Sequence, residues 1–586
     1  MFGSPSTRLG SGRRRSSRLW LGAGVLSLAI TSAVAAGGDV SAKQDGKPNP
    51  PGNPDPAGQL VPVQLLAFND YHGHVEPDAA GTVGGELAGG GQYLAAKLAE
   101  LRAGEENSLT VAAGDLIGGS PFFSGLFHDE PSVESLNAMH LDVSSVGNHE
   151  FDEGVEELLR MQNGGCHPVD GCYFPDQPYA GADFQWLAAN VQNDAGETPL
   201  PPYWIEQFEN VKIGFIGMTL EATDTLVAAV GIQGWDFLDE AETANALVPI
   251  LEAQGVNAIV VLLHEGGSQT PPPGDVDACV GISGPVVAIS AALDPQIDAM
   301  ITGHTHLPYN CVLDGRIVTS AYSYGRVVSE IDLVLDKRTH DVRRDLSSAT
   351  NHPVLRAALA PDPAVTAVIE KWAPLAADAN NTIIGTTAEP IVRGGTPPGS
   401  DRGVESPIGN LVADAQLWAT SAAGAQLALM NPGGLRADLP AGDVSFGQAF
   451  NVQPFGNTLY TFPMTGSQIA NVLLEQCQPF GSSRPVLHLG VSEGFTYDRS
   501  ISIVAGNCVA ISISNVRLNG ELIVASQTYM VTANNFLADG GDNFTTFATI
   551  DPGTRIDGGN DLLAFVNYLG TFSPVSAPGT DRVNEF

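Results

Sequence analysis

Polar residues follow five apolar, strand-like segments of this chain, and this repeated pattern constrains the fold more than any other feature. The apolar runs are residues 63–68, 109–113, 143–146, 258–263 and 299–302. Helical patterns lie between them, as in residues 92–102 and 241–254. Strands that alternate with helices predict a layered α/β domain. Ligands of such sheets bind just beyond the strand ends, so the polar residues there are candidates for a functional site.

The polar segments share the residue types that bind divalent metals. They comprise Asp70 and His72, then Asp115, then Asn148 and His149, then His264, then His304 and His306. A single histidine after a strand is usually structural, but five clusters in sequence order are hard to explain in that way. These residues supply enough oxygen and imidazole ligands for two metal ions with one shared ligand, and no thiol. The pattern therefore favours a two-metal phosphoesterase.

Length and charge exclude several classes of protein. The chain has 586 residues, which predicts at least two domains. It is 43% hydrophobic and 16% charged, as in globular proteins. A net charge of -38 repels nucleic-acid polymers and anionic membranes. A small anionic substrate remains possible where metal ions and a few arginines reverse the local field. The sequence does not predict an oligomeric state.

The first 35 residues are typical of a cleaved export signal. Basic residues at 13–15 and 18 precede a short apolar run at 19–30, and Ala33-Val34-Ala35 fits a cleavage site. An uncleaved membrane anchor is the weaker interpretation, because the apolar run is too short for a typical span. Residues 36–59 are rich in Gly and Pro and predict a disordered linker. We therefore expect a secreted or cell-envelope protein without stable membrane insertion after signal cleavage.

The six cysteines predict disulfide bonds, because an even number in an exported chain suits an oxidising compartment. Local pairing would join Cys166 to Cys172, Cys279 to Cys311 and Cys477 to Cys508. Six cysteines allow fifteen pairings, so the sequence alone leaves this open. Zinc binding by cysteine is less favoured, because the chain has no C-x2-C pair.

The motifs together resemble a known family. They are Asn69-Asp70-Tyr71-His72-Gly73-His74, Gly114-Asp115, Gly147-Asn148-His149-Glu150-Phe151-Asp152, His264 and Gly303-His304-Thr305-His306. This set is similar to the calcineurin-like metallophosphoesterases, and more fully to the secreted 5′-nucleotidase family, over about residues 60–570. The resemblance implies a four-layer α/β/β/α sandwich at residues 60–345 and an α+β substrate-binding domain at 381–586. The sequence between them predicts an interdomain linker at 346–380, with a helix at 361–380 that begins at Asp362-Pro363.

The resemblance also implies roles for the polar residues. One metal ion would be held by Asp70, His72, Asp115 and His306, and the other by Asp115, Asn148, His264 and His304. Some relatives have Gln at the position of His306, and imidazole there favours Zn, Mn or similar ions over Mg. His149 and Asp152 would form the catalytic pair. His149 would donate hydrogen bonds to the developing charge, and Asp152 would orient it.

The C-terminal part has its own matching residues. The resemblance implies that Phe455 and Phe536 sandwich a nucleobase, Asp542 binds the ribose, Asn431 binds the base, and Arg402 and Arg436 bind phosphate, with Asn148 also near the substrate. In isolation, the two Phe would be interpreted as core residues, and Arg402 and Arg436 as surface residues. Some relatives carry a further Arg where this chain has Pro398, and Arg393 is a candidate substitute. Monophosphates are therefore favoured over diphosphates.

The sequence thus predicts an exported hydrolase with two metal ions that removes phosphate from nucleotides, most readily nucleoside 5′-monophosphates. Within the same enzyme class, the alternatives are a UDP-sugar hydrolase, a 2′,3′-cyclic nucleotide hydrolase or a thiosulfohydrolase-like relative. A surface-binding protein that has lost catalysis is the alternative from another class. The retained Phe455, Phe536 and Asp542 favour a nucleoside-bearing substrate.

Overall fold

The computed structural model describes residues 58–77, 81–270 and 274–586. The predicted signal peptide and nearly all of the predicted linker at residues 36–59 lie outside these ranges. In the part of the chain that the structure describes, no helix combines the length and the apolar character that a membrane crossing requires.

The N-terminal part contains two large sheets whose central strands are parallel. The first has the order β18-β17-β1-β4-β5-β6, with β19 paired to β17. Its strands are β1 (Leu60–Phe68), β4 (Ser108–Ala113), β5 (Val143–Ser145), β6 (Gln185–Leu187), β17 (Val327–Asp336), β18 (Asp341–Val342) and β19 (Ser348–Pro353). The second has the order β15-β16-β14-β11-β9-β8. Its strands are β8 (Tyr203–Phe208), β9 (Val211–Thr219), β11 (Ala258–His264), β14 (Ile297–Thr302), β15 (Tyr309–Leu313) and β16 (Arg316–Ser320).

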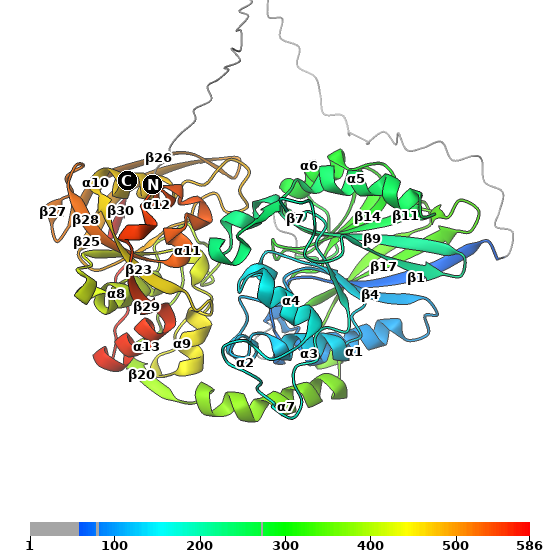
Figure 1. Cartoon of the computed structure of the whole chain (residues 1–586), viewed down its shortest axis with the longest axis horizontal. Coiled ribbons are helices and arrows are strands. Elements are labelled where there is room, and N and C mark those ends of the chain that lie inside the picture. Colours follow the sequence, from blue (N-terminus) through cyan, green and yellow to red (C-terminus); the bar gives the residue numbers. More distant parts are fainter. Residues whose placement is uncertain (1–57, 78–80, 271–273) are drawn as a thin grey trace, which may run out of the picture. The chain divides into compact units, whose positions relative to one another are not determined.

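Alternating side chains explain why both sheets are buried on two faces. In β1, Val63 and Leu65 join the core between the sheets, whereas Leu66 and Phe68 join the core under the helices. The strand β11 divides its side chains in the same way. Figure 1 shows α5 (Glu240–Glu252) and α6 (Pro285–Ala292) outside one sheet, and α1 (Gly91–Arg102) and α3 (Glu130–Ala138) outside the other. The predicted four-layer α/β/β/α arrangement is confirmed.

The predicted strands and helices of this part match the observed ones closely. The strand predicted at 258–263 ends one residue later, and the helix predicted at 92–102 begins one residue earlier. β4 pairs in parallel with both β1 and β5, and β11 pairs in parallel with β14. The polar residues that follow these neighbouring strands therefore emerge at a common edge of each sheet.

The predicted connecting helix is α7 (Pro363–Asn380). Asp362 caps it, because its carboxylate accepts hydrogen bonds from the backbone N–H groups of Ala364 and Val365. Buried Trp372 donates its indole N–H to Glu134 of α3 at 2.9 Å. Residues 348–353, which the sequence predicts to be in the linker, instead form β19 and pair with β17. The first sheet therefore extends to Pro353.

The C-terminal part is α+β, as predicted. A five-stranded sheet has the order β24-β21-β28-β23-β29 and a four-stranded sheet has the order β27-β26-β25-β30. Their outer strands are β24 (Gly490–Val491), β29 (Ile556–Asn560), β27 (Glu521–Leu522) and β30 (Val583–Glu585). The strands that matter for the site are β21 (Leu427–Met430), β23 (Thr458–Thr465), β25 (Phe495–Val504), β26 (Asn507–Leu518) and β28 (Thr528–Asn534). The main helices are α8 (Pro407–Ala419), α9 (Phe446–Val452), α10 (Gly466–Leu474), α11 (Asn535–Ala538) and α13 (Asp561–Phe572).

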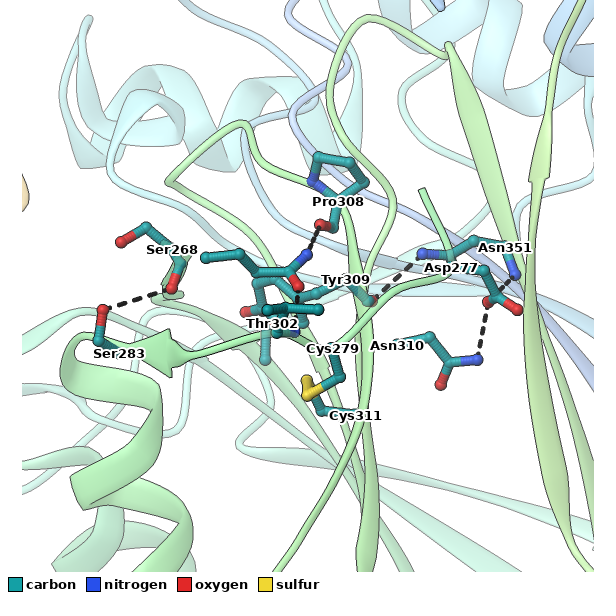
Figure 2. The surroundings of a disulfide bond; sticks show 12 residues. Ser268, Asp277, Cys279, Ser283, Thr302, Pro308, Tyr309, Asn310, Cys311 and Asn351 are labelled. Carbon is teal, nitrogen blue, oxygen red and sulfur yellow. Dashed lines mark hydrogen bonds between the residues drawn. A yellow bond between two sulfur atoms is a disulfide. The ribbon is translucent and has the colours of Figure 1, made fainter. Parts of the chain in front are cut away.

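The cysteines pair locally, as predicted, and none is free. Figure 2 shows the bond between Cys279 and Cys311, which ties the segment after β12 (Ser268–Gln269) to β15. Two neighbouring contacts hold the same segment. Asn351 donates its side-chain amide to the carbonyl of Val276 at 2.8 Å, and Asn310 donates to the Asp277 carboxylate at 2.8 Å. This segment is therefore fixed both to β15 of the second sheet and to β19 of the first.

We expect that replacing Cys279 and Cys311 by Ser lowers the free energy of unfolding by about 2–4 kcal/mol, because the unfolded chain loses a loop constraint. Urea unfolding of the non-reduced protein measures this loss. The pair Cys477 and Cys508 is a matched control, because the two disulfides span 32 and 31 residues. The loop-closure argument predicts nearly equal losses for the two double variants. Unchanged unfolding midpoints in both would contradict it.

Candidate active site

The predicted metal ligands have an unusual backbone conformation. Asp70, His72, Asp115, His304 and His306 all have positive φ angles, between 46° and 68°. Such left-handed conformations are uncommon for residues other than glycine, and they cluster at functional sites. The chain turns sharply after each strand and directs these side chains back toward one point. Each turn has backbone support, as in the bond from the Asp70 N–H to the Gly114 carbonyl at 3.0 Å.

One group of ligand atoms is formed by Asp70, His72 and His306. The Nε2 atom of His306 lies 3.1 Å from the Asp70 carboxylate and 3.1 Å from Nε2 of His72. His72 donates its Nδ1–H to the carbonyl of Gly118 at 2.8 Å. In the neutral ring this bond leaves the lone pair on Nε2, the atom that faces His306.

A second group is formed by Asp115, His264 and His304. His264 donates its Nδ1–H to the carbonyl of Ala113 at 2.7 Å, and its Nε2 lies 3.0 Å from the Asp115 carboxylate. Asn148 belongs to this group, because its side-chain oxygen lies 3.1 Å from Nδ1 of His304. Asp115 also lies 3.5 Å from Nε2 of His72. It therefore faces both groups, as a bridging ligand would.

The donor set fits divalent cations. Burial lowers the pKa of His72 well below its ordinary value, lowers that of His304 to about 3, and lowers that of His306. These rings are therefore neutral and present lone pairs. When neither Nε2 carries a proton, the two imidazole lone pairs that face each other at 3.1 Å repel unless a cation lies between them. Imidazole with carboxylate and amide oxygen suits Zn, Mn or similar ions.

Glu150 holds the turns of two motifs together. Its carboxylate accepts the backbone N–H groups of Asp115 at 2.9 Å, Leu116 at 2.8 Å and Gly147 at 2.5 Å. It is 2% exposed, so these bonds are shielded from water. The sequence left open whether this side chain points away or supports the ligands. The structure shows that it supports the backbone of Asp115.

His149 and Asp152 form a hydrogen-bonded pair beside the ligand groups. The Nδ1 atom of His149 lies 2.7 Å from the Asp152 carboxylate, and the His149 backbone N–H donates to Asp115 at 2.9 Å. Burial alone would lower the pKa of His149, but the carboxylates of Asp152 and Asp115 outweigh it and raise the pKa. With Nδ1 engaged by Asp152, Nε2 is the ring atom free to contact a substrate.

Three of the predicted substrate residues meet around Gly433 in the C-terminal part. A Cβ atom at Gly433 would lie 3.2 Å from the Asp542 carboxylate, 3.5 Å from the Arg402 guanidinium and 3.5 Å from the Asn431 amide. Asn431 donates to Asp542 at 3.3 Å, and Asn534 donates to Asn431 at 3.0 Å. Asn534 therefore orients Asn431. The small Gly433 leaves room for a ligand between these polar groups.

One cavity joins both halves of the site. Its volume is about 1140 Å³, above the usual range for small-molecule pockets. Its walls include the predicted residues Asp115, Asn148, His149, Asp152, His304, His306, Arg402, Asn431, Arg436, Phe455, Phe536 and Asp542. Asp70, His72 and His264 lie behind this wall, fully buried. The structure thus brings all of the predicted site residues to one cavity or to the ligand groups beneath it.

The two predicted aromatic residues lie on the same cavity but in different surroundings. The ring of Phe455 is nearly parallel to the His149 ring, with centroids 5.9 Å apart. The Arg436 guanidinium lies 5.7 Å from the centre of the Phe455 ring. Phe536 lies over Gly541, where a Cβ atom would come within 2.5 Å of its ring. Both residues form part of the wall of this cavity.

Comparisons with known proteins agree with this geometry. Residues 63–308 match the family model of calcineurin-like phosphoesterases, and residues 383–549 match the 5′-nucleotidase C-terminal domain. The cell wall protein Lmo0130 of Listeria monocytogenes is 32% identical over 539 residues, which cover 88% of this chain and 67% of that protein. The chain belongs to the calcineurin-like phosphoesterases that carry a 5′-nucleotidase C-terminal domain. The matched calcineurin-like domain is that of phosphoesterases, which are phosphoric ester hydrolases.

Two further relatives define the extent of the match. Endonuclease YhcR of Bacillus subtilis is 33% identical over 533 residues, which cover 89% of this chain but 41% of that protein. The chain thus spans less than half of this longer relative. The crystal structure of the 5′-nucleotidase precursor from Thermus thermophilus matches with a TM-score of 0.70 and 26% identity, covering 90% of this chain and 99% of that one.

The structure adds residues to the site that sequence reasoning missed. Arg484 lines the cavity from the loop between α10 and β24 (Gly490–Val491), and Tyr324 lines it beside His306, with ring centroids 5.3 Å apart. Arg393 also lies on the wall, but it forms an ion pair with Asp438 at 3.0 Å. Among the described residues, Arg484 has no such carboxylate partner. Neither Arg484 nor Tyr324 belongs to a recognisable motif, so no sequence signal marked them.

We expect Glu150→Gln to weaken the affinity for divalent metal by about 10- to 100-fold, the usual effect of losing a residue that orients ligands. The amide NH₂ would face backbone N–H groups, so the free energy of unfolding should also fall by about 1–3 kcal/mol. Competition with a chelating dye and urea unfolding measure the two effects. Glu156→Gln, on the exposed side of the first turn of α4 (Val155–Asn163), is the control. Equal metal affinity in both variants would contradict the prediction.

Proposed function

We propose that the protein is an exported nucleotide phosphohydrolase that removes phosphate from nucleosides at a centre with two divalent metal ions. The observation that carries this proposal is one continuous cavity that joins the metal-ligand groups to a cradle around Gly433. The cradle is formed by the side chains of Arg402, Asn431 and Asp542. The phosphoesterase residues alone would support any phosphate ester. The aromatic, amide and guanidinium groups of the C-terminal part support a substrate that also carries a nucleoside.

The proposed metal centre follows the two ligand groups. Asp70, His72, Asp115 and His306 would hold one ion, and Asp115, Asn148, His264 and His304 would hold the other. Bound divalent ions would supply Lewis acidity toward a phosphoryl oxygen and a water nucleophile at neutral pH. Zn or Mn suits this ligand set better than Mg, because imidazoles provide much of it.

The proposed catalytic pair acts through hydrogen bonding. Asp152 fixes His149 in one orientation through the bond to Nδ1 at 2.7 Å. Nε2–H of the His149 ring then donates to the phosphoryl oxygen as negative charge develops there. A donor fixed in advance is worth about 10²–10³-fold in rate in comparable sites. The raised pKa of His149 supports this role, because it favours the protonated ring.

The proposed substrate contacts use the C-terminal part. Arg402 and Arg436 line the cavity without a carboxylate partner among the described residues, so both guanidiniums are free to bind phosphate oxygens. Asp542 would accept the ribose hydroxyls, and Asn431, oriented by Asn534, would bind the base edge. Phe455 and Phe536 would stack on the base. Asn148 would contact the phosphate as well as a metal ion.

The alternatives differ in the group that is attached to phosphate. Endonuclease YhcR is named for cleavage of nucleic acid, but a chain with a net charge of -38 repels a polyanion. UDP-sugars and 2′,3′-cyclic nucleotides would use the same cradle, whereas thiosulfate esters would not need it. We further propose that the chain is exported, because its three disulfides suit an oxidising compartment.

A panel of substrates tests the nucleotide assignment. With Mn or Zn added, AMP, GMP and UMP should be hydrolysed with higher kcat/KM than p-nitrophenyl phosphate, UDP-glucose, 2′,3′-cyclic AMP or single-stranded DNA. Replacing both Phe455 and Phe536 by Ala should lower kcat/KM for AMP by at least 30-fold, because each base stack is worth roughly 1–3 kcal/mol. Hydrolysis of p-nitrophenyl phosphate should change much less.

Phe480→Ala is the matched control for this double variant, since Phe480 is 84% exposed and lies outside the cavity wall. It should leave both activities unchanged. Equal losses on AMP and p-nitrophenyl phosphate in the double variant would instead identify the two rings as core packing. The nucleoside assignment would then fail, while the phosphoesterase assignment would stand.

The unpaired Arg484 bears on the length of the phosphate chain. Pro398 removes an arginine that some relatives have, and Arg393 is engaged by Asp438. We propose that Arg484 supplies the missing contact to a second phosphate. Arg484→Ala should lower kcat/KM for ADP about 10- to 100-fold, the worth of a charged hydrogen bond, and change AMP little. Arg484→Lys keeps the charge and should restore part of the activity on ADP. Equal effects on ADP and AMP would exclude this role.

A further inference from the structure

A cluster of two histidines and two glutamates lies outside the active site. One ligand atom from each of these residues lies within 4.8 Å of the others. The cluster joins three segments that are distant in sequence. His128 lies in the turn between α2 (Phe122–Gly125) and α3, Glu153 and Glu157 lie at the start of α4, and His167 lies in the loop closed by the Cys166–Cys172 disulfide.

The hydrogen bonds around His128 match those of a metal-ligating histidine. Its Nε2 lies 2.8 Å from the Asp170 carboxylate, and its Nδ1 lies 2.7 Å from the Glu153 carboxylate. Metal-bound histidines usually donate their other ring N–H to a carboxylate, which fixes the tautomer and the ring plane. Asp170 is placed to accept that N–H. The lone pair of His128 then points toward Glu153, on the side of the cluster.

The other residues of the cluster are also held in place. Arg160 donates two hydrogen bonds to the Glu157 carboxylate, one from Nε at 2.9 Å and one from a terminal nitrogen at 2.7 Å. The side chain of Glu157 is 11% exposed and that of His167 is 12% exposed. The rings of His128 and His167 are stacked with centroids 3.7 Å apart. Two imidazolium ions would repel each other at this distance, so at least one ring is neutral. Nδ1 of His167 accepts the backbone N–H of Asp170 at 3.1 Å, and a metal ion bound at this atom would take the place of that hydrogen bond.

The local charge favours a cation. Three carboxylates surround the histidines, those of Glu153, Glu157 and Asp170, and Arg160 is the one basic side chain that the described contacts place among them. Two imidazoles and two carboxylates without a thiol suit Zn or a similar transition-metal ion. Four protein ligands leave no open position, which is typical of structural rather than catalytic zinc.

We propose that this cluster is a structural binding site for a divalent transition-metal ion, best suited to Zn, which clips the Cys166–Cys172 loop to α4. Its ligands are His128, Glu153, Glu157 and His167. Binding replaces any proton on the ligating nitrogens, and these protons pass to the solvent. This site is separate from the proposed catalytic centre and shares no residue with it.

The clip would stabilise the contact between the loop and the connecting helix. Tyr173 and Phe174, directly after the disulfide, pack on Trp372 of α7 with ring centroids 5.7 Å and 4.8 Å apart. Phe127, next to His128, packs on the same ring at 4.9 Å. The metal site thus lies next to the aromatic side chains that pack on Trp372. Its expected effect is on stability and not on the chemistry of hydrolysis.

Metal content measured on the full chain tests the proposal. After chelation, incubation with Zn²⁺ and desalting, the double variant His128→Asn, His167→Asn should hold about one ion fewer per chain than the wild type. Asn tolerates the positive φ of His128. The control is His140→Asn, His340→Asn, whose residues also have positive φ but lie outside both clusters. The control should keep the wild-type content. Equal zinc content in all three proteins would overturn the proposal.

A second measurement covers the case in which the double variant folds poorly. Glu153 is 45% exposed, so Glu153→Gln should keep the fold and still weaken the site. With excess EDTA this variant and the wild type should unfold at the same temperature. With Zn²⁺ the wild type should gain more thermal stability than the variant. An identical gain in unfolding temperature in the two proteins would contradict the proposal. The cluster would then be a set of histidine–carboxylate ion pairs that binds no metal.

Discussion

The Asp115 carboxylate is the point on which the two ligand groups depend. It lies 3.0 Å from His264, which ends a strand of the second sheet, and 3.5 Å from His72, which follows a strand of the first. A buried carboxylate in that position needs cations or N–H donors to compensate its charge. Glu150 fixes the backbone of Asp115, and the His149 N–H binds its oxygen. This one carboxylate therefore contacts residues of both sheets. It is also held by the turns with positive φ angles and by the pair of His149 and Asp152.

The packing of the two sheets explains why that convergence is stable. Val63 and Leu65 on one sheet and Val260 and Leu262 on the other share one core. The helices outside each sheet bury the opposite faces. With both faces of each sheet covered, the strands cannot shift by one residue without moving apolar side chains to the wrong face. The strained turns at the strand ends can therefore be maintained, because the surrounding structure determines them.

In the proposed function, the C-terminal part determines which phosphate ester can use this centre. Arg402, Arg436 and Arg484 face the cavity in a chain that has 27 basic and 65 acidic residues. Most basic side chains in such a chain find an acidic partner, as Arg393 does with Asp438. Guanidiniums without an acidic partner, beside a metal centre, make the local electrostatic potential positive in an otherwise acidic chain. Such a region suits an anion. The cluster at His128 shows the opposite case, where three carboxylates and a single arginine suit a cation.

The sequence by itself determined the strands of the first part and the order of the ligand residues, because these depend on short-range periodicity and spacing. It suggested local cysteine pairs, but only the structure selected them from fifteen possible pairings. It also indicated the family, since its motifs are short and contiguous. Only the tertiary structure decided which side chains meet. Arg484 and the His128 cluster gave no sequence signal, because they depend on segments that are distant in the chain, as His128 and Glu153 are. Residues 348–353 joined the first sheet by pairing with β17, a long-range contact that local sequence does not encode.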